Sequence, residues 1–194
     1  MIKQSYHYFL LSIFSVLITL VSLPIFTKFI TPYGFGIIAL ATLIGGIFAN
    51  LLSLGLPAAT YRSFYENGSS KTFYTVNFTN LIFILVIYFI FFLIIFFSFD
   101  NLSGLINKDD FNIEVILIAY TSSCLIVLYN LFTKLLVHKN ESKKFALTDL
   151  FYKISLTATS IVLVFYLQNY WALIYGTFFS TLIFVIYLFY VNRK

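Results

Sequence analysis

The chain has 194 residues, of which 61% are hydrophobic and only 10% are charged, and its formal net charge is +5. A soluble domain carries about a quarter charged residues, so this composition excludes an ordinary soluble enzyme and indicates an integral membrane protein. The basic residues are scattered between apolar runs, which argues against nucleic acid as a partner.

Six segments are long and apolar enough to cross a bilayer as helices, for which about 20 mostly apolar residues are needed. The alternating ten-residue segments typical of a membrane β-barrel are not found. We therefore predict an all-α fold, a polytopic membrane bundle of six transmembrane helices that forms a single lobe over residues 1–194. The predicted spans are 6–30, 35–56, 73–97, 113–137, 145–167 and 171–191.

The distribution of basic residues predicts the orientation of these spans. The short links at 31–34 and 167–170 and the acidic link at 98–112 fall on one side of the membrane. Both termini and the links at 57–72 and 138–144 fall on the other side. Of the 12 basic residues, only Lys28 and Lys108 lie nearer the first side. Such a bias over short loops marks the cytoplasmic side, so both termini are predicted to be cytoplasmic.

The first span carries a line of hydroxyl groups on Ser12, Ser15, Thr19 and Ser22. Steps of three, four and three residues place these groups on one face of a helix. Small and hydroxyl residues are common where membrane helices pack closely, and the same line would suit the wall of a water-accessible cavity. Both interpretations stay open. Pro24 in the same span removes a backbone hydrogen bond and favours a kink.

The second span combines small residues with one amide. Gly45, Gly46 and Gly55 would let a neighbouring helix approach closely, and Asn50 places a polar side chain within the bilayer. Such an amide is expected to bond to a neighbouring helix, with contact to a ligand as the alternative.

The third and fourth spans carry further amides at Asn80 and Asn130, for which the same two interpretations apply. From residue 81 to residue 97 the third span is apolar on every side except at Tyr88. We therefore expect this stretch to face lipid all round.

Charged residues near or within a span need a partner, water or a route to the interface. Arg62 would serve as a cytoplasmic anchor, pair with Glu66 at i,i+4, or bind phosphate in a cavity with its planar guanidinium. Lys28 lies near the outer end of the first span, where snorkelling to the interface is the usual behaviour. Asp149 and Lys153 lie four residues apart in the fifth span, with the acid first, which predicts a structural ion pair.

Motifs for a nucleotide, a metal or a catalytic group are missing from the sequence. It contains no phosphate-binding glycine loop and no His/Cys/Asp/Glu cluster with metal-ligand spacing. No Ser-His-acid set or carboxylate pair can be defended, and the single cysteine, Cys124, carries no redox signature. We therefore predict no cofactor, no metal site and no enzymatic activity.

Taken in order, these features resemble the amino-terminal half of the polysaccharide flippases, which belong to the multidrug/oligosaccharidyl-lipid/polysaccharide exporter superfamily. A basic amino terminus leads into the polar first span, which ends Leu-Pro-Ile-Phe-Thr-Lys-Phe-Ile at 23–30. The turn Thr-Pro-Tyr-Gly-Phe-Gly-Ile follows at 31–37, although it is shorter between Pro and Tyr than in the family. The second span closes on Ser-Leu-Gly-Leu at 53–56 with Tyr-Arg at 61–62, and a basic loop occupies 139–144.

This resemblance implies export of a polyprenyl-pyrophosphate-linked oligosaccharide across the bacterial inner membrane during surface polysaccharide (O-antigen) biosynthesis. Two six-helix lobes would enclose a cationic cavity that opens alternately to each side, while the polyprenyl tail stays among the membrane lipids. Arg62 and Lys28 match the cationic cavity best, because arginine binds phosphate groups bidentately. The candidate substrate contacts are completed by Ser12, Ser15, Thr19, Ser22 and Asn50.

The family normally has twelve or more spans, whereas this chain ends after six. We therefore expect a fragment, a truncated remnant that does not transport, or a lobe that pairs with a second lobe or a second copy of itself. A multidrug exporter of the same superfamily is the alternative transporter, but the first three spans contain no acidic residue for a cationic drug. A membrane-embedded glycan polymerase or acyltransferase would need a large outer loop or a catalytic set, and neither is found.

Overall fold

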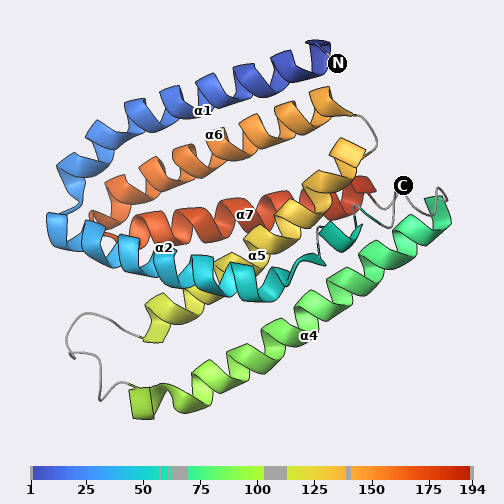
Figure 1. Cartoon of the computed structure of the whole chain (residues 1–194). Helices are drawn as coiled ribbons and strands as arrows, with labels where there is room; N and C mark the ends of the chain where they lie inside the picture. Colours follow the sequence, from blue (N-terminus) through green and yellow to red (C-terminus); the bar gives the residue numbers. More distant parts are fainter. Residues whose placement is uncertain are drawn as a thin grey trace. The chain divides into compact units, whose positions relative to one another are not determined.

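The computed structural model describes residues 2–56, 58–60, 62, 70–102, 113–138 and 141–192, and this part of the chain is helical apart from its turns. Its long helices are shown in Figure 1. They are α1 (Ile2–Phe29), α2 (Pro32–Ser53), α4 (Ser70–Leu102), α5 (Ile113–His138), α6 (Ser142–Leu167) and α7 (Trp171–Asn192). Each of these helices is long and apolar enough to cross a membrane. The predicted all-α membrane fold is confirmed, and the side on which each terminus lies stays a prediction.

Helix bounds differ from the predicted spans where a helix continues beyond its apolar stretch. The largest difference is in α4, whose 33 residues exceed the predicted span 73–97 at both ends. A helix of that length extends about 50 Å, well beyond a hydrocarbon core of about 30 Å. A helix longer than the hydrocarbon is thick either tilts within the bilayer or extends beyond it.

The turn between α1 and α2 is formed by a capped helix start. The Thr31 hydroxyl accepts a hydrogen bond from the Gly34 N–H at 3.2 Å, and the Thr31 carbonyl accepts one from the Phe35 N–H at 3.1 Å. Pro32 occupies the first helical position, where a missing N–H leaves no bond unmade. The tight turn predicted here is confirmed, and α2 begins three residues earlier than its predicted span.

At its other end α2 stops early because Leu54 and Gly55 have left-handed backbone conformations, with φ of 37° and 76°. Glycine adopts such a conformation without steric cost. The three glycines predicted to admit a neighbour differ in what they do. A Cβ on Gly45 would lie 2.8 Å from the Ser123 hydroxyl of α5, but one on Gly46 or Gly55 would meet no described residue within 4 Å. Among the described residues a neighbouring helix therefore approaches closely at Gly45 alone of the three.

The chain divides into two compact units, each of which is described here by itself. One contains Met1–Leu40 and Phe132–Lys194, and is called the α1–α6–α7 unit after its main helices. The other contains Ala41–Leu131 and is called the α2–α4–α5 unit. Whether the two behave as a single lobe stays a prediction.

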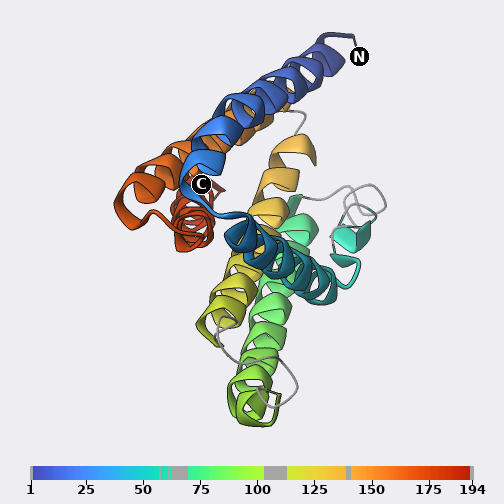
Figure 2. The ribbon, with the colours of Figure 1, turned by 90° about the vertical axis from the view of Figure 1, so that its left-hand side faces the viewer.

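In the α1–α6–α7 unit, α6 packs against both α1 and α7, as the two views in Figures 1 and 2 show. A buried cluster of Ile30, Val164 and Ala172 lies where the α1–α2 turn meets the α6–α7 turn. A Cβ added to Gly34 in the first turn would lie 3.3 Å from the Tyr170 Cβ in the second. The two short links therefore lie side by side, as their assignment to one side of the membrane predicted.

In the α2–α4–α5 unit, an aromatic cluster joins the three helices. The buried ring of Tyr120 on α5 stacks on Tyr88 of α4, with centroids 5.1 Å apart, and meets Phe48 of α2 edge-on at 4.7 Å. The Tyr120 hydroxyl donates to the Tyr88 carbonyl at 2.9 Å, and the Tyr88 hydroxyl pairs with that of Thr121 at 3.2 Å. These bonds hold the rings in register along with their packing.

The face that α4 buries corrects one prediction. Asn77, Asn80, Ile84 and Tyr88 recur at steps of three and four residues, so they share one side of the helix. The first three are buried, and Tyr88 makes the contacts just described. The stretch 81–97 therefore does not face lipid all round, because Ile84 and Tyr88 belong to this packing face.

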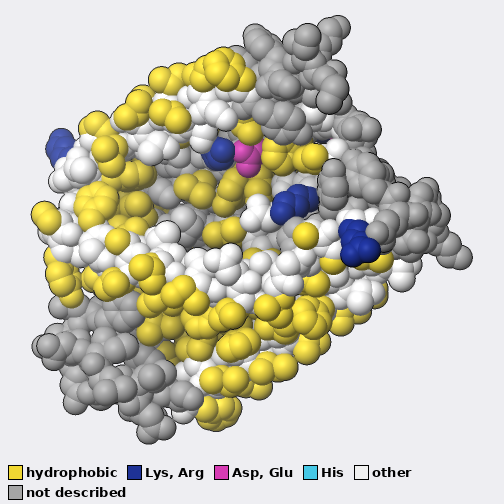
Figure 3. All heavy atoms as spheres, in the orientation of Figure 1, with side chains coloured by type: hydrophobic (Ala, Val, Ile, Leu, Met, Phe, Trp, Pro, Cys, Tyr) yellow, Lys and Arg dark blue, Asp and Glu magenta, His cyan; other side chains and the backbone are white. Residues whose placement is uncertain are grey.

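The remaining surface of these helices is apolar. Figure 3 shows hydrophobic side chains spread over the described helices on the face drawn, with few charged side chains among them. Large residues such as Phe89, Leu93 and Ile186 are more than half exposed. Soluble proteins rarely expose contiguous apolar surface on this scale, whereas lipid tails would cover it.

Candidate functional site

The residues predicted to contact substrate lie in both units. Ser12, Ser15, Thr19, Ser22 and Lys28 lie on α1, in the α1–α6–α7 unit. Asn50 lies near the end of α2, and Arg62 lies beyond it, both in the α2–α4–α5 unit. The structure thus brings the hydroxyl groups and Lys28 onto one helix and leaves their relation to Arg62 a prediction.

The line of hydroxyl groups on α1 is divided by burial. Ser22 is buried, Ser15 is half-buried, and Ser12 and Thr19 are exposed. The Thr19 hydroxyl donates to the Ser15 carbonyl and the Ser22 hydroxyl donates to the Thr19 carbonyl, each at 3.0 Å. Bonds of this kind satisfy a hydroxyl within its own helix, as the bilayer requires. Ser22 therefore fits the packing interpretation, while the exposed pair still fits a cavity wall.

Lys28 is exposed in the last turn of α1, and its Nζ lies 5.7 Å from the centre of the Phe29 ring. A cation is favourable at a helix carboxyl end and over an aromatic face. The helix continues through Pro24, whose carbonyl accepts a bond from the Thr27 hydroxyl at 3.1 Å. This position at the helix end is the one expected of a snorkelling lysine.

Arg62 and Asn50 are both exposed. The Asn50 carbonyl accepts bonds from the Ser53 hydroxyl at 3.0 Å and from the Leu54 N–H at 3.1 Å, where α2 ends. Glu66, the predicted partner of Arg62, lies outside the described residues. The ion pair between them therefore stays a prediction.

The segment that carries Arg62 is tied to α4 by a buried polar contact. Two residues before Arg62, the Thr60 hydroxyl accepts a bond from the Asn80 side-chain amide at 2.6 Å and donates to the Leu56 carbonyl at 2.9 Å. Both side chains are buried. Asn80 thus bonds to a neighbouring segment, as predicted. The contact fixes the backbone that presents the guanidinium.

The predicted ion pair in α6 is confirmed, with the Lys153 Nζ 2.9 Å from an Asp149 carboxylate oxygen. Its depth is the new observation. Lys153 lies 11 residues after Ser142 and 14 before Leu167, the ends of the helix. At 1.5 Å per residue these are about 16 and 21 Å, so the Cα of Lys153 lies near the middle of the helix.

A charged side chain at this depth indicates a functional role. The side chain of Lys153 is 36% exposed and that of Asp149 is 15% exposed. Charged side chains inside a membrane almost always face a bundle interior or a water-filled cavity, because lipid does not solvate them. This pair is not among the substrate contacts predicted from sequence. Its central place in the fifth span was the signal that could have identified it.

Next to this pair, α6 and α7 meet through small and hydroxyl side chains. The Tyr152 hydroxyl pairs with that of Thr181 at 3.0 Å, and the Thr159 hydroxyl pairs with that of Ser180 at 2.6 Å. A Cβ added to Gly176 would lie 2.9 Å from the Cα of Ser160. This is the close packing typical of membrane helices, and it fixes the helix that carries Lys153.

Among the residues that the structure describes, no group of three or more His, Cys, Asp or Glu side chains could hold a metal ion. The His7 and His138 side chains lie outside the described residues, as do Asp100, Asp109 and Asp110. The candidate residues named above carry hydroxyl, amide, ammonium and guanidinium groups, together with the Asp149 carboxylate. Such groups bind anions and sugars.

Comparison with known proteins shows the family of the chain. A family model described as polysaccharide biosynthesis protein matches residues 2–194. No curated protein and no solved structure matches the chain significantly. Because the family match covers nearly the whole chain, the protein belongs to the polysaccharide biosynthesis protein family.

Proposed function

We propose that the chain is a lobe of a flippase that exports a lipid-linked oligosaccharide across the bacterial inner membrane by alternating access. The family supplies the role in polysaccharide biosynthesis, and the six membrane-spanning helices supply the location. The observation that carries the step to transport is the Asp149–Lys153 pair near the middle of α6. A lysine at that depth needs water or an anion beside it, and the pyrophosphate of a lipid-linked sugar is such an anion.

In this proposal the pair works by exchange of partners. Without substrate, Asp149 neutralises Lys153, so no charge is left unpaired within the bilayer. A pyrophosphate oxygen then competes for the ammonium group with a charge-assisted hydrogen bond. In the α2–α4–α5 unit, Arg62 is a separate candidate for phosphate contact, because its guanidinium is planar and suited to bidentate bonds. The Thr60–Asn80 bond ties the segment before it to α4.

The exposed hydroxyl groups of Ser12 and Thr19, with Asn50, are the proposed contacts for the sugar. Lys28, at the end of α1, is proposed to meet the anionic head group where it enters or leaves the cavity. The polyprenyl tail remains in the bilayer during transport. A second six-helix lobe or a second copy of the chain completes the cavity, because alternating access needs two bodies that move against each other.

The proposal is tested by deleting the gene in its source organism and complementing the deletion with variants. We expect the deletion to abolish surface polysaccharide and to accumulate the lipid-linked unit on the cytoplasmic face. Wild type should restore export, whereas Lys153→Gln and Arg62→Gln should each lower it at least tenfold. Lys143→Gln is the matched control, because Lys143 is exposed in the first turn of the same helix.

Unchanged surface polysaccharide in the deletion strain would contradict the proposal. So would full export by the Lys153→Gln variant at wild-type protein levels. A deletion that sensitises cells to cationic drugs and leaves the glycan unchanged would support a multidrug exporter in its place.

A further inference from the structure

A groove of about 570 Å³ lies in the α1–α6–α7 unit, between the first turns of α6 and the last turns of α7. Its lining includes the buried Leu136 and Leu188 as a floor and the exposed Leu147, Phe151 and Ile183 as walls. Lys144 contributes an ammonium group at the end where α6 begins. The groove is thus apolar along its length and cationic at one end.

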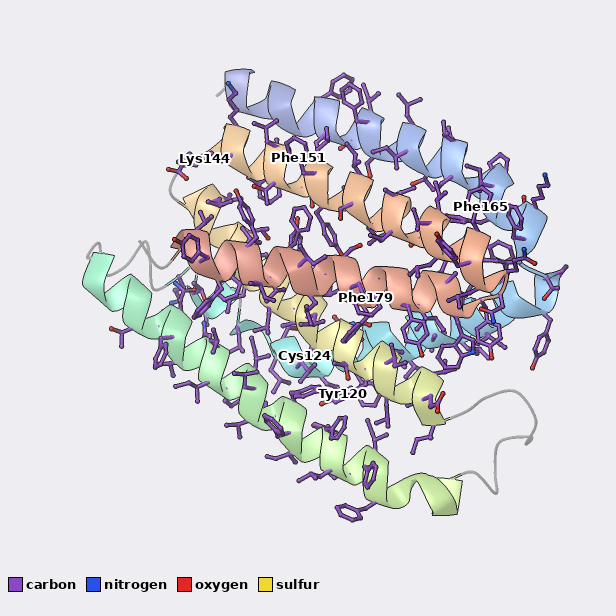
Figure 4. All side chains as sticks on the ribbon, turned by 180° about the vertical axis from the view of Figure 1, so that it is seen from behind. Tyr120, Cys124, Lys144, Phe151, Phe165 and Phe179 are labelled. Carbon is purple, nitrogen blue, oxygen red and sulfur yellow. The ribbon has the colours of Figure 1, made fainter. Side chains whose placement is uncertain are left out.

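The length of this groove matches one leaflet of a bilayer. Figure 4 shows Lys144 near the start of α6 and Phe151 further along the same helix. Seven residues separate them, which is about 10 Å along the helix axis, and the groove residues Ile183 and Val191 of α7 are about 12 Å apart. Half of a hydrocarbon core is about 15 Å thick. An acyl chain that enters at Lys144 would therefore lie along most of the groove within one leaflet.

The cationic end is open to an additional anion. Lys144 pairs with the Glu141 carboxylate at 2.9 Å, but its side chain is 68% exposed, and such exposed pairs hold their partners weakly. Glu141 occupies the N-cap position, and its side chain makes no capping bond to a backbone N–H of the helix. The first backbone N–H groups of α6 therefore lack a side-chain cap from Glu141, and they lie at the same end as Lys144.

We infer that this groove binds an anionic membrane phospholipid, with the phosphate at Lys144 and an acyl chain over Leu188 and along Phe151. Basic pockets between transmembrane helices on the cytoplasmic side bind anionic head groups, and the positive-inside rule places this end of α6 on that side. A neutral lipid would leave Lys144 without a role, and a protein partner would have to displace lipid from an open apolar surface.

This site is separate from the proposed transport site. Lys144 and Lys153 are nine residues apart on α6, which is two and a half helical turns, so they project from opposite sides of the helix. The groove lining and Lys153 therefore lie on different sides of α6. Phospholipid binding therefore does not depend on the proposed flippase activity.

The experiment is native mass spectrometry of the full chain, purified in detergent and titrated with phosphatidylglycerol or phosphatidylcholine. We expect wild type to retain phosphatidylglycerol preferentially. Lys144→Gln should weaken that retention about fivefold, which is the effect of one basic residue at a membrane surface. Lys143→Gln, the neighbouring lysine outside the groove lining, should change it less than twofold. Glu141→Gln should strengthen it, because Lys144 loses its competing partner.

The apolar part is tested with one pair of tryptophan variants on α7. Ile183→Trp fills the groove and should lower retention, whereas Ile186→Trp places the same ring on an exposed residue outside the lining and should not. Circular dichroism checks that both variants fold, and the Lys144→Gln result stands even where Ile183→Trp does not fold. The transport variant Lys153→Gln should retain phosphatidylglycerol normally, which separates this inference from the proposed function.

Three results would overturn the inference. Equal loss of phosphatidylglycerol retention in Lys143→Gln and Lys144→Gln would show that binding depends on general surface charge and not on the groove. Normal phosphatidylglycerol retention in a folded Ile183→Trp variant would show that the acyl chain does not lie in the groove. A change from dimer to monomer in Ile183→Trp, with lipid retention unchanged, would show that a second copy of the chain occupies the groove.

Discussion

The two units hold their helices together in different ways. Between α6 and α7 small side chains meet, with Gly176 against Ser160 and a hydroxyl pair between Thr159 and Ser180, beside one ring contact of Tyr152 with Phe184. Between α4 and α5 the contact is made by large rings, with Tyr88 stacked on Tyr120. In lipid no hydrophobic force favours helix association, so close packing and hydrogen bonds must provide it. The α6–α7 contact includes a close approach of the two backbones, and the α4–α5 contact is made by interlocking aromatic rings.

The two contacts also share one arrangement. In each, a tyrosine hydroxyl meets a threonine hydroxyl on the neighbouring helix: Tyr88 with Thr121, and Tyr152 with Thr181. Each threonine hydroxyl also bonds to a carbonyl four residues earlier on its own helix, at 2.7 and 2.6 Å. Because a carbonyl only accepts, each threonine donates to it, and the tyrosine must donate to the threonine. The α4–α5 contact and the α6–α7 contact therefore contain the same kind of hydrogen bond, from a tyrosine hydroxyl to a threonine hydroxyl.

The largest loss in the free energy of unfolding is expected from Tyr120→Ala in the α2–α4–α5 unit. This change removes a buried ring together with its stack on Tyr88 and its bond to the Tyr88 carbonyl. Truncation of a large buried aromatic side chain lowers the free energy of unfolding by about 3–5 kcal/mol. Unfolding in mixed micelles, followed by circular dichroism, measures it. Tyr166→Ala is the control, since Tyr166 is 82% exposed, and an equal loss there would contradict the ring-based contact.

A smaller loss in the free energy of unfolding is expected from Gly176→Ala in the α1–α6–α7 unit. The added Cβ would meet the Ser160 side chain and lie 2.9 Å from its Cα, so the backbones of α6 and α7 would have to separate. Overpacking of this kind destabilises by about 1–3 kcal/mol. The matched control is Gly46→Ala, whose Cβ would meet no described residue within 4 Å. Because alanine favours helix over glycine, the control should gain stability, and a loss of equal size in both would refute the close-approach argument.

The contact between Thr60 and Asn80 should have a smaller effect, measured as a coupling energy. Thr60→Val, Asn80→Leu and the double variant form a mutant cycle in which the 2.6 Å bond is the shared term. Interhelical hydrogen bonds in membranes average about 0.6 kcal/mol and reach about 1.7 kcal/mol. Since both side chains are buried, we expect about 1 kcal/mol. Additive single effects would show that the bond does not hold the Arg62 segment in place.

The sequence predicted the features that depend on composition and local spacing. Apolar length predicted the spans, the Thr-Pro-Tyr-Gly stretch at 31–34 predicted a tight turn, and the i,i+4 spacing of Asp149 and Lys153 predicted their ion pair. These follow from rules that act within a few residues. The tertiary contacts required more, because any face of an apolar helix can meet either lipid or another helix.

That limit explains which predictions failed. The 81–97 stretch looked lipid-facing because Tyr88 stood alone within it, yet Asn77 and Asn80 lie on the same helical face just before it. Gly45 and Gly46 are neighbours in sequence, and among the described residues only the first meets another helix. The depth of Lys153 could be estimated from its distance to both ends of the predicted span. Only the observed bounds of α6 placed it near the middle of the helix.

The smallest loss in the free energy of unfolding should come from removal of one tyrosine hydroxyl in each unit. This change tests the tyrosine–threonine hydrogen bond that the two contacts have in common. In Tyr88→Phe and Tyr152→Phe the threonine partner keeps its bond to a carbonyl of its own helix, so no buried donor is left unsatisfied. Each change should therefore cost only about 0.6 kcal/mol, the average for such bonds in membranes. The free energy of unfolding of the two variants, measured under one set of micelle conditions, should be equal within error. A much larger loss in Tyr88→Phe would mean that the ring stack depends on its hydroxyl, and the two units would then differ in their polar links as well as in their packing.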